Sequence, residues 1–249
     1  METNNQKNDQ NIIPNDADKQ QKGVNVPNLR FNSFDSIWDH DRLGNYVETI
    51  TDFVAAGSFA DLRKNVVYYS EPQFAQLIRT TDLKNGILKD PVFIDEKAFK
   101  YLWRVNLDKP AVVLPNIGAN IGEVYYISAK QLEYCNNVLG PNAILLRKIK
   151  NNYYLYTYLL SKPFQNELIK LIGASGQPKF NKTELKNIFI NFPNACEQQK
   201  ISNFFSLLDQ RIDTQTKIIE DLECQINYIR HKLFTGYIND DINTQKYII

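Results

Sequence analysis

The stretch from residue 196 to residue 234, CEQQKISNFFSLLDQRIDTQTKIIEDLECQINYIRHKLF, is dominated by one repeating pattern. Apolar residues return at alternating steps of four and three residues for more than four heptads, and only Gln215 interrupts them. A period of about 3.5 residues held this long is typical of a coiled-coil seam rather than of an ordinary surface helix. The stripe consists of Ile201, Phe205, Leu208, Ile212, Gln215, Ile219, Leu222, Ile226, Ile229 and Leu233.

This stretch is therefore predicted to form a rod that pairs with another helix. Pro193-Asn194-Ala195 indicates its start, Glu197 in the first turn suits the helix dipole, and Gly236 indicates its end. At about 1.5 Å per residue, residues 197 to 234 would span roughly 57 Å. The alternative is a helix that folds back on its own domain. A single Gln on the seam fits the paired rod, in which it would help to fix the register.

The rest of the chain predicts an α+β fold, with a mixed globular domain at 29–194 before a coiled-coil helix at 195–238. Residues 1–28 are rich in Asn, Gln, Lys and Asp and contain no aromatic residue, so they are predicted to be a disordered tail. Residues 239–249 are predicted to be a second tail. Apolar runs and turn signals predict strands at 65–69, 74–79, 111–114, 121–127, 143–149 and 187–192 and helices at 95–102 and 153–172.

Composition excludes several kinds of site. The three cysteines lie far apart without a CxxC pair, and only two histidines occur, so a disulfide framework or a histidine-based metal site is poorly supplied. No apolar run approaches the roughly 18 residues of a membrane span, and the N-terminus is polar, so a cytoplasmic protein is expected. Neither a P-loop string nor Asn-Pro-Pro-Tyr, the string expected of an adenine methyltransferase, occurs.

One group of residues resembles a nuclease site. Asp90 and Asp95 with Lys97 offer two carboxylates and a lysine that could hold a divalent metal ion and orient a water molecule. The spacing is short, however, and Asp95-Glu96-Lys97 fits better as the charged first turn of a helix. A small metal-dependent DNA endonuclease is therefore an alternative function, as is a plain coiled-coil adaptor.

Charge is balanced over the whole chain, with 29 basic and 28 acidic residues, but not locally. Between Arg147 and Lys186 eight basic residues occur with only two acidic ones, Glu167 and Glu184. Such an excess suits a polyanion, although a solvated lysine-rich surface is an equal alternative. Polar and basic side chains in four loops are therefore candidates for DNA contacts. The candidates are Arg63, Lys64, Arg79, Thr80, Asn116, Ser175, Gln177, Lys179 and Lys182.

The chemistry of these side chains suggests their roles. Lysine binds phosphate, arginine pairs with guanine or phosphate, and a Gln amide can pair with adenine. Each has a structural alternative: Arg79 in a salt bridge to Asp82, Asn116 as a turn-forming residue, and the loop 173–180 as a simple linker. Base contacts are assigned to Arg79, Asn116 and Gln177, and phosphate contacts to Lys64, Lys179 and Lys182.

Several strings together resemble the specificity (S) subunit of type I restriction–modification systems, over about residues 26 to 238. The most specific are the interior strings and the opening of the helix, and the entry string is weaker. These strings are Val26-Pro27-Asn28-Leu29-Arg30-Phe31 with Trp38 and Arg42-Leu43-Gly44, then residues 79–86, 115–122 and 175–179, and finally Pro193, residues 197–201, Leu208-Asp209 and Ile212.

The resemblance implies a subunit that reads double-stranded DNA through a target recognition domain and has no chemistry or cofactor of its own. In the family, the helices set the distance between half-sites and dock the methyltransferase subunits. That methyltransferase carries S-adenosylmethionine and methylates adenine at N6, while a separate motor subunit uses ATP and Mg²⁺ and cleaves DNA.

This sequence differs from the usual family pattern of two recognition domains and two antiparallel helices, because it contains one of each. The unmatched stripe is where a second helix is expected to lie. Two copies related by a two-fold axis would supply it and would predict an inverted-repeat target, read at two ends of a rod roughly 50 to 60 Å long. Pairing with a different specificity chain is the alternative.

Overall fold

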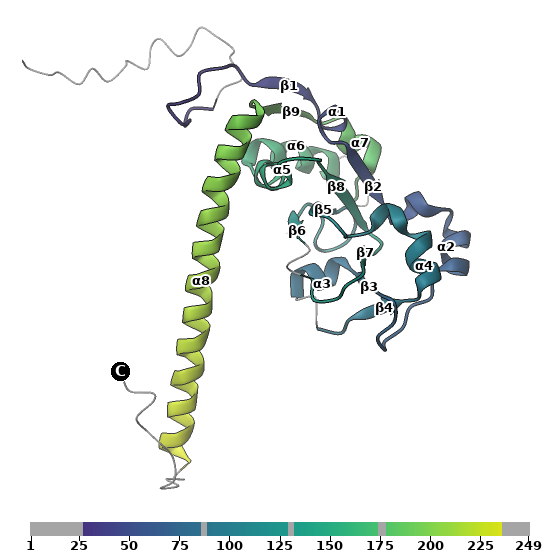
Figure 1. The fold of residues 1–249 in the computed structure, drawn as a ribbon, viewed down its shortest axis with the longest axis vertical. Coiled ribbons are helices and arrows are strands. Elements are labelled where there is room, and N and C mark those ends of the chain that lie inside the picture. Colours follow the sequence, from purple (N-terminus) through teal and green to yellow (C-terminus); the bar gives the residue numbers. More distant parts are fainter. Residues whose placement is uncertain (1–26, 86–88, 129–131, 174–177, 236–249) are drawn as a thin grey trace, which may run out of the picture.

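A mixed body of short strands and helices leads into one long helix, α8 (Ala195–Phe234). The computed structural model describes residues 27–85, 89–128, 132–173 and 178–235 (Figure 1). The predicted class, α+β with a long C-terminal helix, is confirmed. The other elements are β1 (Asp39–Arg42), α1 (Leu43–Tyr46), β2 (Thr49–Asp52), η2 (Phe53–Ala56), α2 (Phe59–Asn65), β3 (Ala75–Ile78), α3 (Thr80–Asn85), β4 (Val92–Ile94), α4 (Glu96–Tyr101), η3 (Trp103–Val105), β5 (Ala111–Pro115), β6 (Tyr125–Ile127), β7 (Asn137–Leu139), β8 (Ala143–Arg147), α5 (Asn152–Leu159), α6 (Lys162–Gly173), α7 (Lys182–Lys186) and β9 (Phe189–Phe192).

Three small sheets make up the body. The largest has the order β2-β8-β5-β6 with antiparallel neighbours, and Val113 of β5 pairs with Leu145 of β8 in its centre. The second has the order β4-β3-β7, in which β3 and β7 run parallel. The third pairs β1 with β9 and brings the start of the body next to the start of α8.

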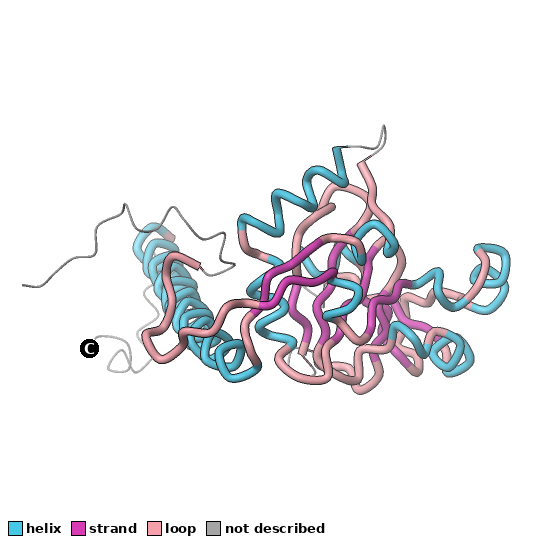
Figure 2. Tube along the Cα trace, turned by 90° about the horizontal axis from the view of Figure 1, so that it is seen from above, coloured by secondary structure: helices cyan, strands magenta, loops and turns pink. Residues whose placement is uncertain are grey.

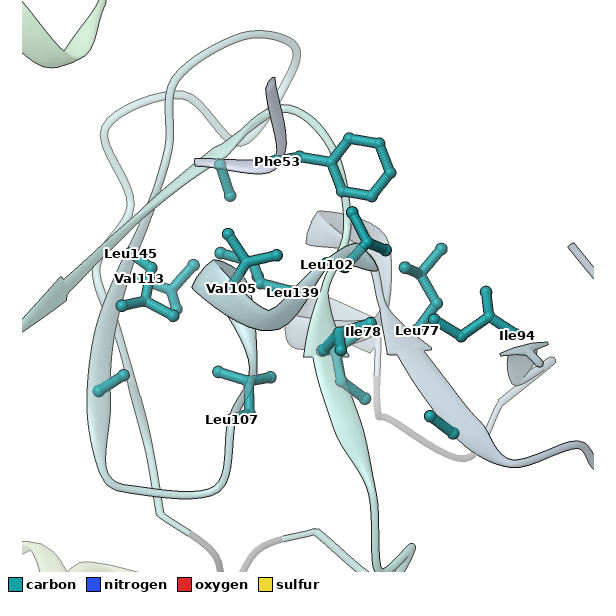
Figure 3. Close-up of a cluster of buried hydrophobic side chains, with 14 of the residues drawn as sticks. Phe53, Leu77, Ile78, Ile94, Leu102, Val105, Leu107, Val113, Leu139 and Leu145 are labelled. Atoms are coloured by element: carbon teal, nitrogen blue, oxygen red, sulfur yellow. The ribbon is translucent and has the colours of Figure 1, made fainter. Parts of the chain in front are cut away.

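The largest sheet separates two apolar cores. Val113 and Leu145 point into a core shared with the second sheet, η2 and η3 (Figure 3), whereas their neighbours Leu114 and Ile144 point into a core under α5 and α6. Successive side chains of a strand lie on opposite faces of a sheet, so the continuous apolar runs of β5 and β8 are buried on both sides. The sheet therefore holds the loops at its ends in a rigid frame.

The long helix begins where the sequence predicts. Asn194 caps it, because its Oδ1 accepts a hydrogen bond from the backbone N–H of Glu197 at 3.0 Å. The last helical residue is Phe234, and Gly236 lies outside the described residues. Only the first turns of α8 touch the body, and every residue from Gln210 to Thr235 is exposed. Seen from above, α8 stands beside the body and apart from most of it (Figure 2).

Several predicted elements differ in the structure. The strand predicted at 65–69 is wrong, because α2 ends at Asn65 and only Tyr69 forms an isolated bridge, to Phe93. The helix predicted at 153–172 is two helices, since Pro163 cannot donate to a preceding turn and instead suits the first turn of α6. The strand predicted at 121–127 shortens to β6, because residues 118–122 turn with φ of +97° at Gly118 and +84° at Gly122.

Candidate nucleic-acid interface

Three segments far apart in the sequence converge at one end of the large sheet. These are α3, residues 116–123 and residues 178–180, which we call the loop cluster. Asn120 Nδ2 donates to the carbonyl of Thr80 at 3.4 Å, and Lys84 forms an ion pair with Glu123 at 2.6 Å. These contacts hold α3 against the turn that follows β5.

Asn116 connects the second and third segments of the loop cluster. Its Nδ2 donates to the carbonyl of Phe180 at 2.9 Å, and its own carbonyl accepts from the Phe180 N–H at 3.2 Å. The Phe180 side chain is buried, and Ile117 and Lys179 form an antiparallel bridge beside it. Asn116 therefore fixes the backbone on which Lys179 is presented.

The charged side chains in and next to the loop cluster are mostly paired. Arg79 binds Asp82 through Nε and Nη2, with Nη2–Oδ1 at 2.6 Å, and this pairing raises the pKa of Arg79. Lys182 lies 2.8 Å from Asp52 at the end of β2. Lys84 holds the pKa of the Glu123 carboxyl below its ordinary value. The alternative interpretation of Arg79, a salt bridge to Asp82, is thus what the structure contains.

Two cationic groups nevertheless remain available to bind a ligand. Nη2 of Arg79 also donates to the carbonyl of Asp90 at 2.8 Å, which leaves its Nη1 group without a partner among the described residues. Lys179 is exposed, and no carboxylate within the described part of the chain pairs with it. The structure therefore brings Arg79, Thr80, Asn116 and Lys179 together, with Lys182 adjoining them.

The remaining DNA candidates do not join the loop cluster. Arg63 and Lys64 are exposed in the last turn of α2, which packs against η2 and α4 at the edge of the body opposite α3 (Figure 1). Ser175 and Gln177 lie outside the described residues. Half of the basic residues between 147 and 186 are engaged internally; these are Arg147, Lys148, Lys170 and Lys182.

The apolar stripe of α8 is open to solvent. Ile201 packs partly against the body, but the apolar stripe residues from Phe205 onwards are all exposed, by 41% at Phe205 to 72% at Leu233. The alternative of a helix folded back on its own domain is therefore wrong beyond the first turns. The exposed members of the stripe are Phe205, Leu208, Ile212, Ile219, Leu222, Ile226, Ile229 and Leu233.

A polar side of α8 faces the body instead. A cleft of about 1180 Å³ separates them, and Tyr125, Tyr126, Tyr153 and Tyr156 line its body side. Apart from Ile212, the cleft is lined on the helix side by Gln199, Ser202, Asn203, Ser206, Asp209, Gln210 and Asp213. The two sides meet where the hydroxyl of Tyr153 donates to Asp209. Apart from Ile201 and Ile212, the seam residues therefore lie neither in this cleft nor in the core of the body.

One residue of the nuclease alternative, Asp95, has a structural role. Asp95 caps α4, with its Oδ1 accepting from the Ala98 N–H at 2.7 Å, as its place in a charged first turn predicts. Among the described residues, no three His, Cys, Asp or Glu side chains are grouped so that they could hold a metal ion. None of the described helices is long and apolar enough to cross a membrane.

Comparison with known proteins identifies relatives of this chain. The sequence model of the family described as "Type I restriction modification DNA specificity domain" matches residues 49–224, well over half of the chain. A protein of Methanocaldococcus jannaschii named for the specificity subunit of the type I restriction enzyme MjaX is 39% identical over 101 residues. That match covers 39% of this chain and 24% of the relative.

A solved structure shares the fold of this chain. A chain from a study of complex assembly and conformational transition of the type I R-M system superposes with a TM-score of 0.52 at 16% identity. That superposition covers 84% of this chain and 45% of the other, so this chain spans about half of the structure it matches. The S subunit from M. genitalium gives a TM-score of 0.49 at 17% identity, covering 80% of this chain and 46% of that one. On the family match over residues 49–224, this chain belongs to the type I restriction–modification DNA specificity family.

Proposed function

We propose that this chain reads one half of a bipartite site in duplex DNA as a specificity subunit that performs no catalysis itself. The observation that carries the proposal is the exposed apolar stripe of α8, which follows a body whose described residues form one loop cluster. Burying that stripe against a second helix would hold two loop clusters at a set separation.

The chemistry of the loop cluster supports contact with DNA. Lys179 is an exposed ammonium group suited to a phosphate. Nη1 of Arg79 has no partner among the described residues, and the neighbouring Asp82 carboxylate orients the guanidinium. At Gly118, apart from the adjacent residues, no heavy atom of the described part of the chain lies within 4 Å of where a Cβ would be, so a ligand can approach its backbone closely. Asn116 acts in this proposal by positioning Lys179, and Gln177 and Lys64 remain candidate base and phosphate contacts.

The arrangement of two copies follows from the helix. An antiparallel pair of α8 helices, each of 40 residues and therefore about 60 Å long, would place the two bodies at opposite ends. Two identical reading surfaces related by a two-fold axis would recognise an inverted repeat with an unread spacer. Pairing with a different specificity chain would give an asymmetric target instead.

The enzymatic activities belong to partners in this proposal. A methyltransferase subunit carrying S-adenosylmethionine would dock on the helices and methylate adenine N6 within the site. A motor subunit using ATP and Mg²⁺ would cleave DNA. Family membership supports these partners, and this chain would contribute DNA recognition and geometry.

Methylation mapping tests the proposal directly. The chain is produced together with the methyltransferase of the same host, and the modified adenines in the host DNA are mapped. We expect one bipartite motif with a constant spacer, and an inverted repeat if the chain pairs with itself. Sedimentation of the chain alone and with the methyltransferase gives the stoichiometry. A stable single protomer in both samples, or methylation that does not depend on this chain, would contradict the proposal.

A further inference from the structure

The joint between α8 and the body contains a buried ion pair that the proposed function does not use. The carboxylate of Glu197 in the first turn of α8 is almost fully buried and accepts hydrogen bonds from Arg30 Nε at 2.7 Å and Nη2 at 2.5 Å. Trp38 Nε1 lies 3.4 Å from the same carboxylate. We call Arg30, Trp38 and Glu197 the clasp. It ties α8 to a segment 167 positions away in the sequence.

Neighbouring contacts extend the clasp along the helix. Phe31 packs edge-on against Phe204, with ring centroids 5.9 Å apart, and the ammonium of Lys200 lies over the Phe31 ring. Asn194, the helix cap, also donates to Ser36 at 3.2 Å. The segment before β1 therefore lies against one side of the first turns of α8.

Two further polar contacts join α8 to the body. The buried Gln198 accepts a hydrogen bond from the Tyr46 hydroxyl at 2.9 Å, and about three turns further along α8, Tyr153 donates to Asp209. Together with the clasp, these contacts fix α8 by directional hydrogen bonds from several elements. Hydrogen bonds restrain orientation more narrowly than apolar contacts, which permit sliding and rotation.

The angle between α8 and the body must be held precisely if the spacing of two DNA half-sites is to be recognised. A domain of about 160 residues has a radius of gyration near 15 Å, so its far surface lies about 30 Å from a joint at its edge. Figure 1 shows α3 well away from the first turns of α8. A rotation of roughly 7° at the joint would move such a surface by about 3.4 Å, the rise of one base pair. Reading a spacer to the nearest base pair therefore needs a joint stiff to within a few degrees.

We propose that the Arg30–Glu197 ion pair, with Trp38, is a positioning device that sets the angle between α8 and the recognition body and thereby the spacer length the dimer accepts. This inference rests on the proposed function for its consequence in DNA, but the stiffness of the joint is a property of the chain alone. The planar guanidinium suits this role because its two parallel donors fix both distance and direction.

The joint is tested first without DNA. Exposed cysteines lie on both sides of it, Cys135 in the body and Cys224 on α8, so spin labels can be placed in a Cys196→Ser background. Pulsed EPR on labelled chain diluted with unlabelled chain gives the intraprotomer distance distribution. We expect Glu197→Gln to broaden this distribution about twofold, while Glu220→Gln, on an exposed turn of α8, leaves it unchanged. An unchanged distribution in Glu197→Gln would overturn the proposal.

A second variant guards against a folding defect. Arg30→Lys keeps the charge but loses the bidentate geometry, so it should broaden the distribution while the circular dichroism melt stays cooperative. If Glu197→Gln does not fold, the distance distribution of Arg30→Lys alone tests the proposal. A distribution identical to that of the parent chain would then refute the role of the clasp.

The consequence for DNA is tested by measuring the affinity of the methyltransferase complex for three bipartite sites. Their spacers have the correct length, one base pair fewer or one base pair more. We expect the parent complex to favour the correct spacer by about tenfold or more, and Arg30→Lys to reduce that preference to about threefold with an unchanged affinity for a single half-site. Full discrimination in a variant with a broadened joint would overturn the positioning role. If the parent complex binds no bipartite site, the proposed function fails, while the EPR result still decides whether the clasp stiffens the joint.

Discussion

At the scale of single residues, the side chains of the loop cluster have two kinds of role. Asn116 holds the backbone in place, whereas Lys179 is exposed and can bind a ligand. Asn116→Ala removes the donor to the Phe180 carbonyl. We therefore expect the free energy of unfolding, measured by urea titration, to fall by about 1 to 3 kcal/mol. Lys179→Ala leaves the fold intact because the ammonium is exposed and unpaired among the described residues. It should weaken binding to all duplexes alike and lower the salt slope of log K by about one, as measured by fluorescence anisotropy across a salt series. Lys100→Ala, at an exposed ion pair on α4, is the matched control, and equal losses in both lysine variants would contradict the assignment.

At the scale of elements, α8 is a helix whose stability as a rod depends on a partner, because its second half contacts no other described element. Ile219 is exposed in the isolated chain and would be buried in a pair, and Ala preserves helix propensity. Ile219→Ala removes two buried side chains per dimer at about 2 kcal/mol or more each, so the dissociation constant should rise about a thousandfold. Sedimentation equilibrium measures this, with Glu220→Ala on the adjacent position of the same helix as the control. Equal dissociation constants for the two variants would show that the stripe is not the interface.

At the scale of the whole molecule, the length of α8 would act as a ruler between two half-sites. Deleting residues 220–226 removes one heptad and keeps the stripe in phase, because Ile219 is then followed at the correct steps by Ile229 and Leu233. The rod shortens by about 10.5 Å, and we expect the methylated motif to lose about three base pairs of spacer. Deleting only residues 220 and 221 instead turns the rest of the stripe by about 200° about the helix axis and should abolish pairing. Sequencing of methylated DNA distinguishes these results, and an unchanged spacer after the heptad deletion would exclude the ruler.

Local physical rules account for the features that are predictable from the sequence. The stripe of α8, its start after Asn194 and the helical turn after Asp95 depend on side chains within about four residues of one another, so periodicity and capping reveal them. The apolar runs of β5 and β8 are similarly evident. The short strands β1, β2, β4 and β7 are not, because strands of three or four residues acquire their pairing from distant segments.

The sequence by itself determined the long helix, its seam and the mixed class of the body, since these follow from neighbouring residues. Only the tertiary structure decided which cations form ion pairs. Lys182 pairs with Asp52, which lies 130 positions away in the sequence. Glu197, whose place in the first turn suggested a helix-dipole role, is the buried partner of Arg30. It also decided that Arg63 and Lys64 lie apart from Arg79, Asn116 and Lys179. The physical reason is that pairing between distant side chains depends on where the sheets bring their loops, which no local pattern in a single sequence encodes.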